Sequence, residues 1–228
     1  MKKFLSVFVL TSSFLHAEDL TTAAGIPLNT PWKEALYTFS KENLKHPSWG
    51  LAHSERDYLL TKSIMEKSNE AFDEEVLFAA AFLHDLGGMD AFAVENVDHA
   101  VRSAQLAEEK LPAMGFSADK IPQVKEVILG HTYYGEKPSS KLALAFRDSD
   151  ILDFMGDMGV ARLYGATKDL DPNFSSLAPA TSLIKKFRKD FPDKLSLDAS
   201  KILLEPKIKE MDDFIKSINE WSYGEKAL

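Results

Sequence analysis

The chain has 228 residues, of which 45% are hydrophobic and 11% aromatic, which suits one globular domain with a sizeable core rather than a disordered segment. The formal net charge of −8 and the lack of a basic run argue against a nucleic-acid polymer or an anionic membrane as a partner. Because the chain has no cysteine, disulfides and thiolate metal sites are excluded, and any metal must be held by histidine, aspartate or glutamate.

The N-terminal segment has the layout of a secretory signal peptide over residues 1–17. Two lysines precede a mostly apolar run over residues 4–15, and Ala17 stands directly before the acidic Glu18. This run is shorter than the roughly 20 residues that a membrane-spanning helix needs. Removing residues 1–17 takes away two lysines and no acidic residue, which would leave a net charge near −10. We therefore expect an exported protein, periplasmic or secreted, without a stable membrane span after signal removal.

Helical patterns dominate the rest of the chain, and strand patterns are nearly absent. Residues 18–30 are expected to link the signal peptide to a single all-α domain over residues 31–228. A first helix opens at Thr30-Pro31, where proline fits because its missing N–H has no helical partner. A second helix is expected over residues 50–68. Acidic residues at 73–75 mark the start of a third helix, which is expected to end at Leu86 before two glycines.

Three further helices are predicted before the C-terminal part of the domain. Asp98 caps a helix that Pro112 stops, the next runs from Ser117 to about His131, and a sixth runs from about Ser140 to residue 156.

The C-terminal part, residues 171–222, is expected to hold two helices. One lies around residues 182–189 and the other runs over residues 206–221. The second has an apolar stripe that must pack on the domain, formed by Ile208, Met211, Ile215 and Ile218.

His84 and Asp85 end the most apolar segment of the chain, "FAAAFLHDLGG". A histidine–aspartate pair alone is weak evidence, since a histidine in a last helical turn is also favoured by the helix dipole. However, His53 and His131 both fall on the apolar faces of their predicted helices. Burying several imidazoles and carboxylates is costly unless they satisfy one another or a cation. The combination therefore indicates a divalent metal site.

A further carboxylate ligand is expected from "FRDSDILDFMGD", residues 146–157. Asp148 and Asp150 point about 200° apart on a helix, so one of the two is expected to reach the metal. Both have apolar neighbours one turn away, and the periodicity does not choose between them.

These residues resemble the motif of the HD-domain superfamily of metal-dependent phosphohydrolases, in particular its small stand-alone bacterial members. That family is an all-helical bundle whose motif is a histidine, a distant histidine–aspartate doublet and a later aspartate. The resemblance covers about residues 46–165 and selects Asp150, which follows a small residue and precedes x-Leu. Asp148 then becomes an acidic neighbour behind the ligands. The metal ligands that the resemblance implies are His53, His84, Asp85 and Asp150.

The implied function is an exported metal-dependent hydrolase that cleaves a phosphate ester or anhydride in a small molecule, with a nucleotide as one candidate. The cofactor would be a divalent cation such as Mn²⁺, Fe²⁺, Co²⁺, Ni²⁺ or Zn²⁺, held through Asp85 and the other ligands. It would lower the pKa of a bound water, which attacks phosphorus.

Four other polar residues have two or more interpretations. Arg56, three residues after His53, either holds phosphoryl oxygens or forms an ion pair. His131 could act as a general acid, contact phosphate or bind a second metal. His99, at a helix N-terminus, could contact an anionic ligand, bind a second metal with His131, or have no role; one ion is favoured over two. Asp57 either orients the His53 imidazole or forms an intrahelical pair.

Two other functions fit the same ligands. HD-type hydratases such as cyanamide hydratases have a similar histidine-serine-x-arginine helix, so a small nitrile or another C–N compound is an alternative substrate. A non-catalytic metal-binding envelope protein is the other alternative. Neither the identity of the metal nor the oligomeric state follows from the sequence.

Overall fold

The computed structural model describes residues 20–173 and 175–228, so the predicted signal peptide lies outside the described residues. Within this part the fold is all-α, as predicted: it has ten α-helices, four short 3₁₀ helices and no strand, apart from one isolated bridge between Thr21 and Pro27. None of the described helices combines the length and the apolar character that crossing a membrane requires.

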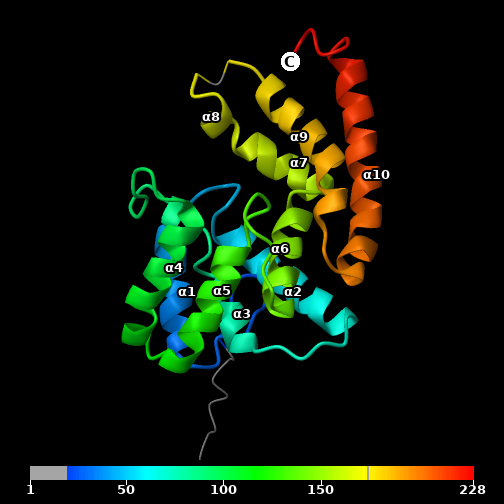
Figure 1. Cartoon of the computed structure of the whole chain (residues 1–228). Helices are drawn as coiled ribbons and strands as arrows, with labels where there is room; N and C mark the ends of the chain where they lie inside the picture. The colour runs from blue at the N-terminus through cyan, green and yellow to red at the C-terminus, as the bar shows by residue number, and fades with distance from the viewer. Residues whose placement is uncertain (1–19, 174) are drawn as a thin grey trace, which may run out of the picture.

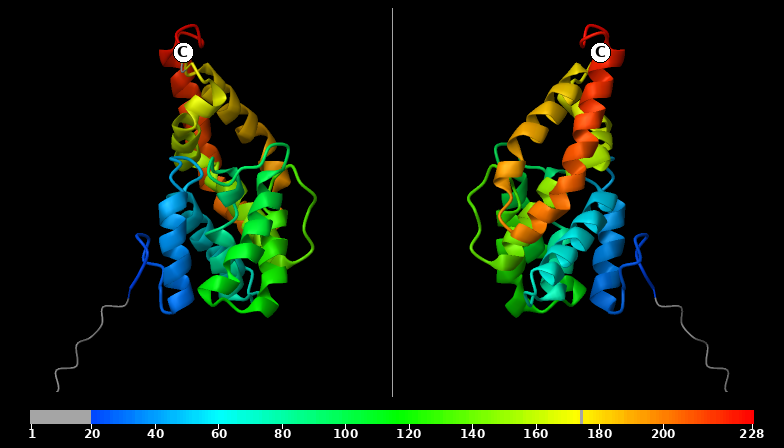
Figure 2. Two further views of the ribbon diagram at one scale, coloured as in Figure 1. Left: turned by 90° about the vertical axis from the view of Figure 1, so that its left-hand side faces the viewer. Right: turned by 90° about the vertical axis from the view of Figure 1, so that its right-hand side faces the viewer.

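The α-helices, in chain order, are α1 (Pro31–Asn43), α2 (Leu51–Lys67), α3 (Glu74–Ala81), α4 (His99–Lys110), α5 (Ile121–Gly130), α6 (Lys141–Asp153), α7 (Gly156–Gly165), α8 (Thr167–Leu170), α9 (Ala178–Asp190) and α10 (Asp198–Trp221). The 3₁₀ helices are η1 (Leu86–Gly88), η2 (Pro112–Met114), η3 (Ala118–Lys120) and η4 (Pro192–Lys194). Figure 1 shows α1 to α6 in one body, with α7, α9 and α10 extending beyond it. In both views of Figure 2 these three helices form the narrower end that holds the C-terminus.

The larger of two hydrophobic cores lies among α1, α3, α4 and α5. Leu36, Phe78 and Val124 are completely buried there, because the apolar faces of their helices meet. Ile26 and Leu28, from the stretch expected to be a linker, are also buried in this core. The segment directly before α1 is therefore packed onto the domain.

The second core lies among α6, α7, α9 and α10, together with the end of α2. Ile151, Phe191 and Met211 are completely buried in it. The apolar stripe predicted for the last helix packs here, with Ile208 and Ile215 partly buried against the same cluster. α2 and α6 pack against each other between the two cores, and two of the four predicted metal ligands, His53 and Asp150, lie on these helices.

The third helix ends at Ala81 rather than at Leu86, so the histidine–aspartate doublet lies on a turn. Hydrogen bonds between residues three apart, typical of a 3₁₀ turn, appear here: the Leu83 N–H donates to the Ala80 carbonyl at 3.1 Å, and the Leu86 N–H to the Leu83 carbonyl at 3.0 Å. At Gly87, which follows, a Cβ atom would lie 2.4 Å from the His99 carbonyl oxygen. Glycine there lets the start of α4 approach the doublet.

The sixth and last helices also differ from their predicted limits. α6 ends at Asp153, and Gly156 then adopts a φ of +74°, which starts the separate helix α7. α10 begins at Asp198, eight residues before the predicted start at Pro206. Pro206 lacks an N–H for the carbonyl of Ile202, but Ile202 is 63% exposed, so water can satisfy that carbonyl.

Asp73 is expected to stabilise α3 as its N-cap. Its Oδ1 accepts from the Glu75 and Val76 N–H groups at 2.9 and 3.2 Å, and its Oδ2 lies 2.8 Å from Lys120 Nζ. Asp73→Ala should lower the free energy of unfolding by about 1 kcal/mol, measured by urea denaturation at pH 7. The exposed Asp90→Ala is the matched control and should change it little.

The same residue gives a pH dependence with a definite sign. Burial raises the pKa of Asp73, but Lys120 and the capped N–H groups hold it below its usual value. A lowered carboxyl pKa stabilises the fold above the unfolded pKa of about 3.9, and this is lost as pH falls through the folded pKa. The difference between wild type and Asp73→Ala should therefore shrink in acid. A constant difference down to pH 2 would contradict this.

Candidate metal centre

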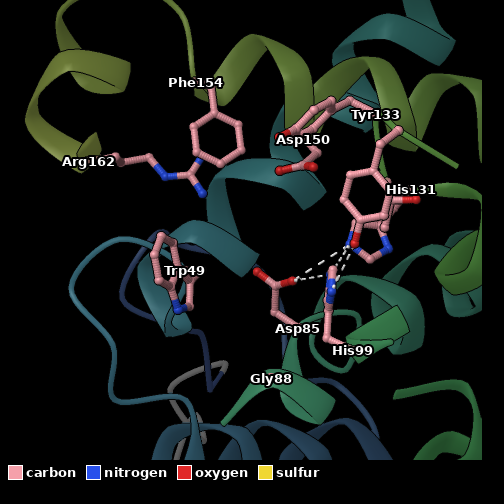
Figure 3. Close-up of a pocket in the computed structure, with 11 residues that line it drawn as sticks. Trp49, Asp85, Gly88, His99, His131, Tyr133, Asp150, Phe154 and Arg162 are labelled. Carbon is pink, nitrogen blue, oxygen red and sulfur yellow. Dashed lines mark hydrogen bonds and ion pairs between the residues drawn. The ribbon is translucent and has the colours of Figure 1, made fainter. Parts of the chain in front are cut away.

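Histidine and aspartate side chains from five separate segments meet at one wall of a cavity of about 290 Å³. The segments are α2, the turn after α3, the start of α4, the residue after α5, and α6. Figure 3 shows part of this group, with Asp85 facing His99 and His131. The full group is His53, Asp57, His84, Asp85, His99, His131 and Asp150.

Three imidazoles are held in the same orientation, with Nδ1 facing an acceptor and Nε2 facing the centre of the group. The acceptors are Asp153 Oδ2 for His53 (2.8 Å), the Ala81 carbonyl for His84 (2.9 Å) and the Ile128 carbonyl for His131 (2.6 Å). These oxygens can only accept, so Nδ1 bears the proton and Nε2 of the neutral ring offers a lone pair. This is the arrangement of histidines that bind metals.

The first donor group lies around His53 and His84. Their Nε2 atoms are 3.2 Å apart, and Asp85 Oδ2 lies 3.5 and 3.4 Å from them. Asp150 Oδ1 is 3.5 Å from His53 Nε2. Ligand atoms about 2.0–2.1 Å from one cation are separated by distances of this size. Three of the predicted ligands, His53, His84 and Asp85, are thus close enough together to share an ion, and Asp150 forms a neighbouring group with His53 and Asp57.

A second donor group uses the other oxygen of Asp85. Asp85 Oδ1 lies 3.4 Å from His99 Nε2 and 3.6 Å from His131 Nε2, and the two nitrogens are 3.1 Å apart. Among the alternatives for His131, this position favours metal binding over donation of a proton. Asp85 can therefore contribute one oxygen to each of two adjacent cations.

Asp57 faces the first group as an intrahelical neighbour of His53 and does not orient that imidazole through Nδ1. Its Oδ2 lies 3.2 Å from His53 Nε2, not near Nδ1, where Asp153 is the partner. Asp57 is completely buried and neither of its oxygens accepts a hydrogen bond. A buried carboxylate that accepts no hydrogen bond is costly, so a cation fits this position. Asp57 is thus a further potential ligand, and Asp153 orients the imidazole.

The pKa values at the centre reflect an excess of carboxylates. Burial raises the pKa of Asp57 well above its usual value. Burial and Arg162 oppose protonation of His53, yet Asp57 and the other carboxylates raise its pKa to about 10. Burial would also raise the pKa of Asp85, but His84 and the other imidazoles hold it well below normal. A bound cation would compete with protons for these side chains.

Asp153, which the sequence reasoning missed, connects the centre to two arginines. Its Oδ1 accepts from Arg56 Nε at 2.7 Å, and its Oδ2 accepts from Arg56 Nη2 at 2.9 Å. Arg162 Nη1 also lies 2.9 Å from Oδ2. Burial raises the pKa of Asp153, but His53 and the arginines hold it well below its usual value. Its spacing of one turn after Asp150 was the available signal.

Arg56 and Asp148 do not line the cavity; Arg56 forms an ion pair, and Asp148 accepts hydrogen bonds from the backbone. Of the two interpretations of Arg56, the structure forms the ion pair, with Asp153. Asp148 accepts from the N–H groups of Ser196 and Leu197 at 2.9 to 3.0 Å, directly before α10. It belongs to neither donor group among the described residues.

Tyr134 was also missed and holds His99. The Tyr134 hydroxyl donates to Asp98 Oδ2 at 2.8 Å and lies 3.3 Å from His99 Nδ1. Because the hydroxyl hydrogen is committed to Asp98, its oxygen accepts from Nδ1, which leaves Nε2 of His99 free to face Asp85.

The family model "HD domain" matches residues 50–155. No curated protein matches the chain.

Three solved structures, all from bacteria, have the same fold. One is a protein of Lactobacillus plantarum, with a TM-score of 0.64 and 19% identity, covering 84% of this chain and 97% of its own. A predicted HD superfamily hydrolase from an uncultured Thermotogales bacterium has a TM-score of 0.59 and 22% identity, covering 84% and 94%. YpgQ of Bacillus subtilis, solved in complex with ADP, has a TM-score of 0.61 and 22% identity, covering 83% and 94%.

Proposed function

Because the chain belongs to the HD-domain superfamily through residues 50–155, we propose that it is a metal-dependent hydrolase that cleaves a phosphate ester or anhydride. One observation supports this most strongly: four imidazole Nε2 atoms and the carboxylates of Asp57, Asp85 and Asp150 converge at the wall of a cavity. A divalent cation held there would supply an activated water and polarise the bond under attack.

The chain's own residues account for the other requirements of hydrolysis. Asp153, Tyr134 and two backbone carbonyls fix the imidazoles, so the donors are organised before a ligand enters. The cavity beside Asp85 and Asp150 admits the substrate. In the reaction the oxygen of water bonds to phosphorus, the bond to the leaving oxygen breaks, and the leaving oxygen takes a proton.

The test is a substrate panel on protein stripped of metal and reloaded with Mn²⁺, Fe²⁺, Co²⁺, Ni²⁺ or Zn²⁺. Release of phosphate or pyrophosphate from at least one phosphorylated compound is the expected result. Nucleoside diphosphates belong on the panel because YpgQ was solved with ADP. Phosphate release that does not depend on the metal would contradict the proposal.

A hydratase or C–N hydrolase is the second candidate, and the cavity lining gives it some support. Trp49, Tyr133 and Phe154 make much of the lining apolar, while Asp85 and Asp150 are acidic. Such a surface disfavours a polyphosphate chain. Release of ammonia or urea from small nitriles or amides, with no phosphate release, would support this candidate. Metal binding without turnover on either panel would support a non-catalytic protein.

We further propose that the centre holds two cations that share Asp85, since its two oxygens face separate pairs of histidines. His99→Gln should then reduce the metal content from two ions per chain to one, measured by elemental analysis after dialysis. His46→Gln is the matched control, because His46 belongs to neither donor group, and it should retain both ions. One ion in the wild type, unchanged in His99→Gln, would contradict the second site.

Export is a separate proposal, supported by the signal-like pattern of residues 1–17. Expression of the full chain in a Gram-negative host should yield a periplasmic form that lacks these residues, identified by mass spectrometry. Cytoplasmic protein with an intact N-terminus would contradict it.

A further inference from the structure

The part of the cavity away from the histidines is formed by one arginine and two aromatic rings. In Figure 3, Arg162 lies across the drawn group from His99 and His131, and the rings of Phe154 and Trp49 flank the space between. All five residues line the same cavity. The histidine end of the cavity carries the metal-binding side chains, whereas the arginine end has no part in the proposed hydrolysis.

Arg162 is fixed in place but has hydrogen-bonding capacity left. It is 3% exposed, its Nε donates to the Ser48 carbonyl at 2.6 Å, and its guanidinium lies 4.0 Å from the centre of the Phe154 ring. Nη1 is close to Asp153 without hydrogen-bond geometry, and neither Nη1 nor Nη2 has a hydrogen-bond acceptor. Buried charged donors without acceptors are costly and rare. An acceptor from a molecule in the cavity would remove this cost.

The two aromatic rings are held rigidly beside the arginine. Trp49 stacks on the His46 ring, with centroids 4.0 Å apart and planes 8° from parallel, and His46 in turn pairs with Asp169 at 3.0 Å. On the other side of the arginine, Phe154 packs edge-on against Phe187 at 5.2 Å. Rigid aromatic walls of this kind suit a flat, apolar group.

The volume and charge of the cavity limit what it can hold. At about 290 Å³ it is roughly twice the volume of a cavity that accommodates benzene, so one substituted ring fits. Among the described residues that line it, Arg162 is the one lysine or arginine, whereas Asp85 and Asp150 are acidic. A di- or triphosphate chain usually needs more cationic partners than this.

We propose that Arg162 is a specificity-determining residue that binds a carboxylate at one end of a single-ring phosphate ester. The ring lies between Trp49 and Phe154, and the phosphoryl group lies at the histidine end beside Asp85. The substrate class is therefore a compact aryl or cyclic phosphate monoester with a second, anionic substituent. This assignment rests on the proposed phosphohydrolase function.

The kinetic test compares 4-carboxyphenyl phosphate with 4-carbamoylphenyl phosphate, which has the same shape without the charge. The metal-loaded wild type should prefer the carboxylate roughly 10- to 100-fold in kcat/KM, the range that charge-assisted hydrogen bonds supply. Arg162→Gln should bring this ratio close to one, mainly through KM. Arg188→Gln, which removes a partly exposed arginine on α9, should leave the ratio unchanged.

The binding test uses calorimetry of metal-loaded protein with benzoate and benzamide, so it does not depend on turnover. Wild type should bind benzoate more tightly, and Arg162→Gln should lose this difference while it retains its metal. If Arg162→Gln does not fold, Arg162→Lys should show a preference for benzoate over benzamide that is weaker than in the wild type but not lost. Lysine keeps the positive charge but cannot donate two parallel N–H bonds to a carboxylate.

The outcomes separate this proposal from the proposed function. Equal binding of benzoate by wild type and Arg162→Gln, or a wild type that does not prefer the carboxylate ester, would overturn the role of Arg162. Arg162-dependent binding of benzoate without hydrolysis of either ester would retain the anion site and contradict the phosphohydrolase.

Discussion

Replacing Asp85 with alanine is expected to abolish both metal retention and turnover. Its two oxygens face the two donor groups, at 3.4 Å from His84 Nε2 on one side and 3.4 Å from His99 Nε2 on the other. Loss of a residue that hydrogen-bonds to a metal ligand lowers metal affinity about 10- to 100-fold. Loss of a ligand that two ions share should lower metal affinity more. Elemental analysis after dialysis and the substrate panel measure the two effects.

Asp90→Ala is the matched control, because it removes an exposed aspartate five residues along the chain. It should retain wild-type metal content and activity. Asp85→Ala with full metal content, or with wild-type turnover, would show that the doublet does not form the catalytic centre.

Replacing Asp153 with asparagine should lower the free energy of unfolding more than any of the other substitutions. The buried carboxylate is the shared partner of His53, Arg56 and Arg162, and Arg162 is itself buried. Removing one partner of a buried ion pair costs about 3–5 kcal/mol, because the remaining charge stays buried. The partial exposure of Arg56 reduces its share of this cost. Urea denaturation should show the loss, and Mn²⁺ affinity should fall about 10- to 100-fold because His53 loses its orientation.

An exposed arginine–aspartate ion pair provides the matched control for Asp153. Arg188 donates from Nε and Nη2 to the two oxygens of Asp212, both at 2.8 Å, in an exposed bidentate pair. Asp212→Asn should cost less than about 1 kcal/mol and leave metal affinity unchanged. Equal losses in the two variants would mean that burial of Asp153 adds nothing to its role.

The sequence allowed the main ligands to be predicted because their signal is local. His53 and His131 lie on apolar helical faces, and the His84-Asp85 doublet ends the most apolar segment, so all must face the interior. The choice of Asp150 over Asp148 needed the resemblance, because both have apolar neighbours.

Roles that depend on contacts between helices could not be predicted in the same way. Helical spacing places Asp57 on the His53 side of α2, but which nitrogen it faces depends on α6, where Asp153 occupies Nδ1. Arg162 reaches the cavity from α7, and no nearby motif marks it. His99 comes close to Asp85 because Gly87 admits the backbone of α4, a packing contact that periodicity does not report.

The most direct test of the metal centre is a crystal structure of Mn²⁺-loaded protein with anomalous diffraction data. We expect one anomalous peak within bonding distance of His53 Nε2, His84 Nε2 and Asp85, and a second beside His99 and His131. At saturating Mn²⁺, the absence of any peak among these side chains, or peaks confined to other surfaces, would contradict the account.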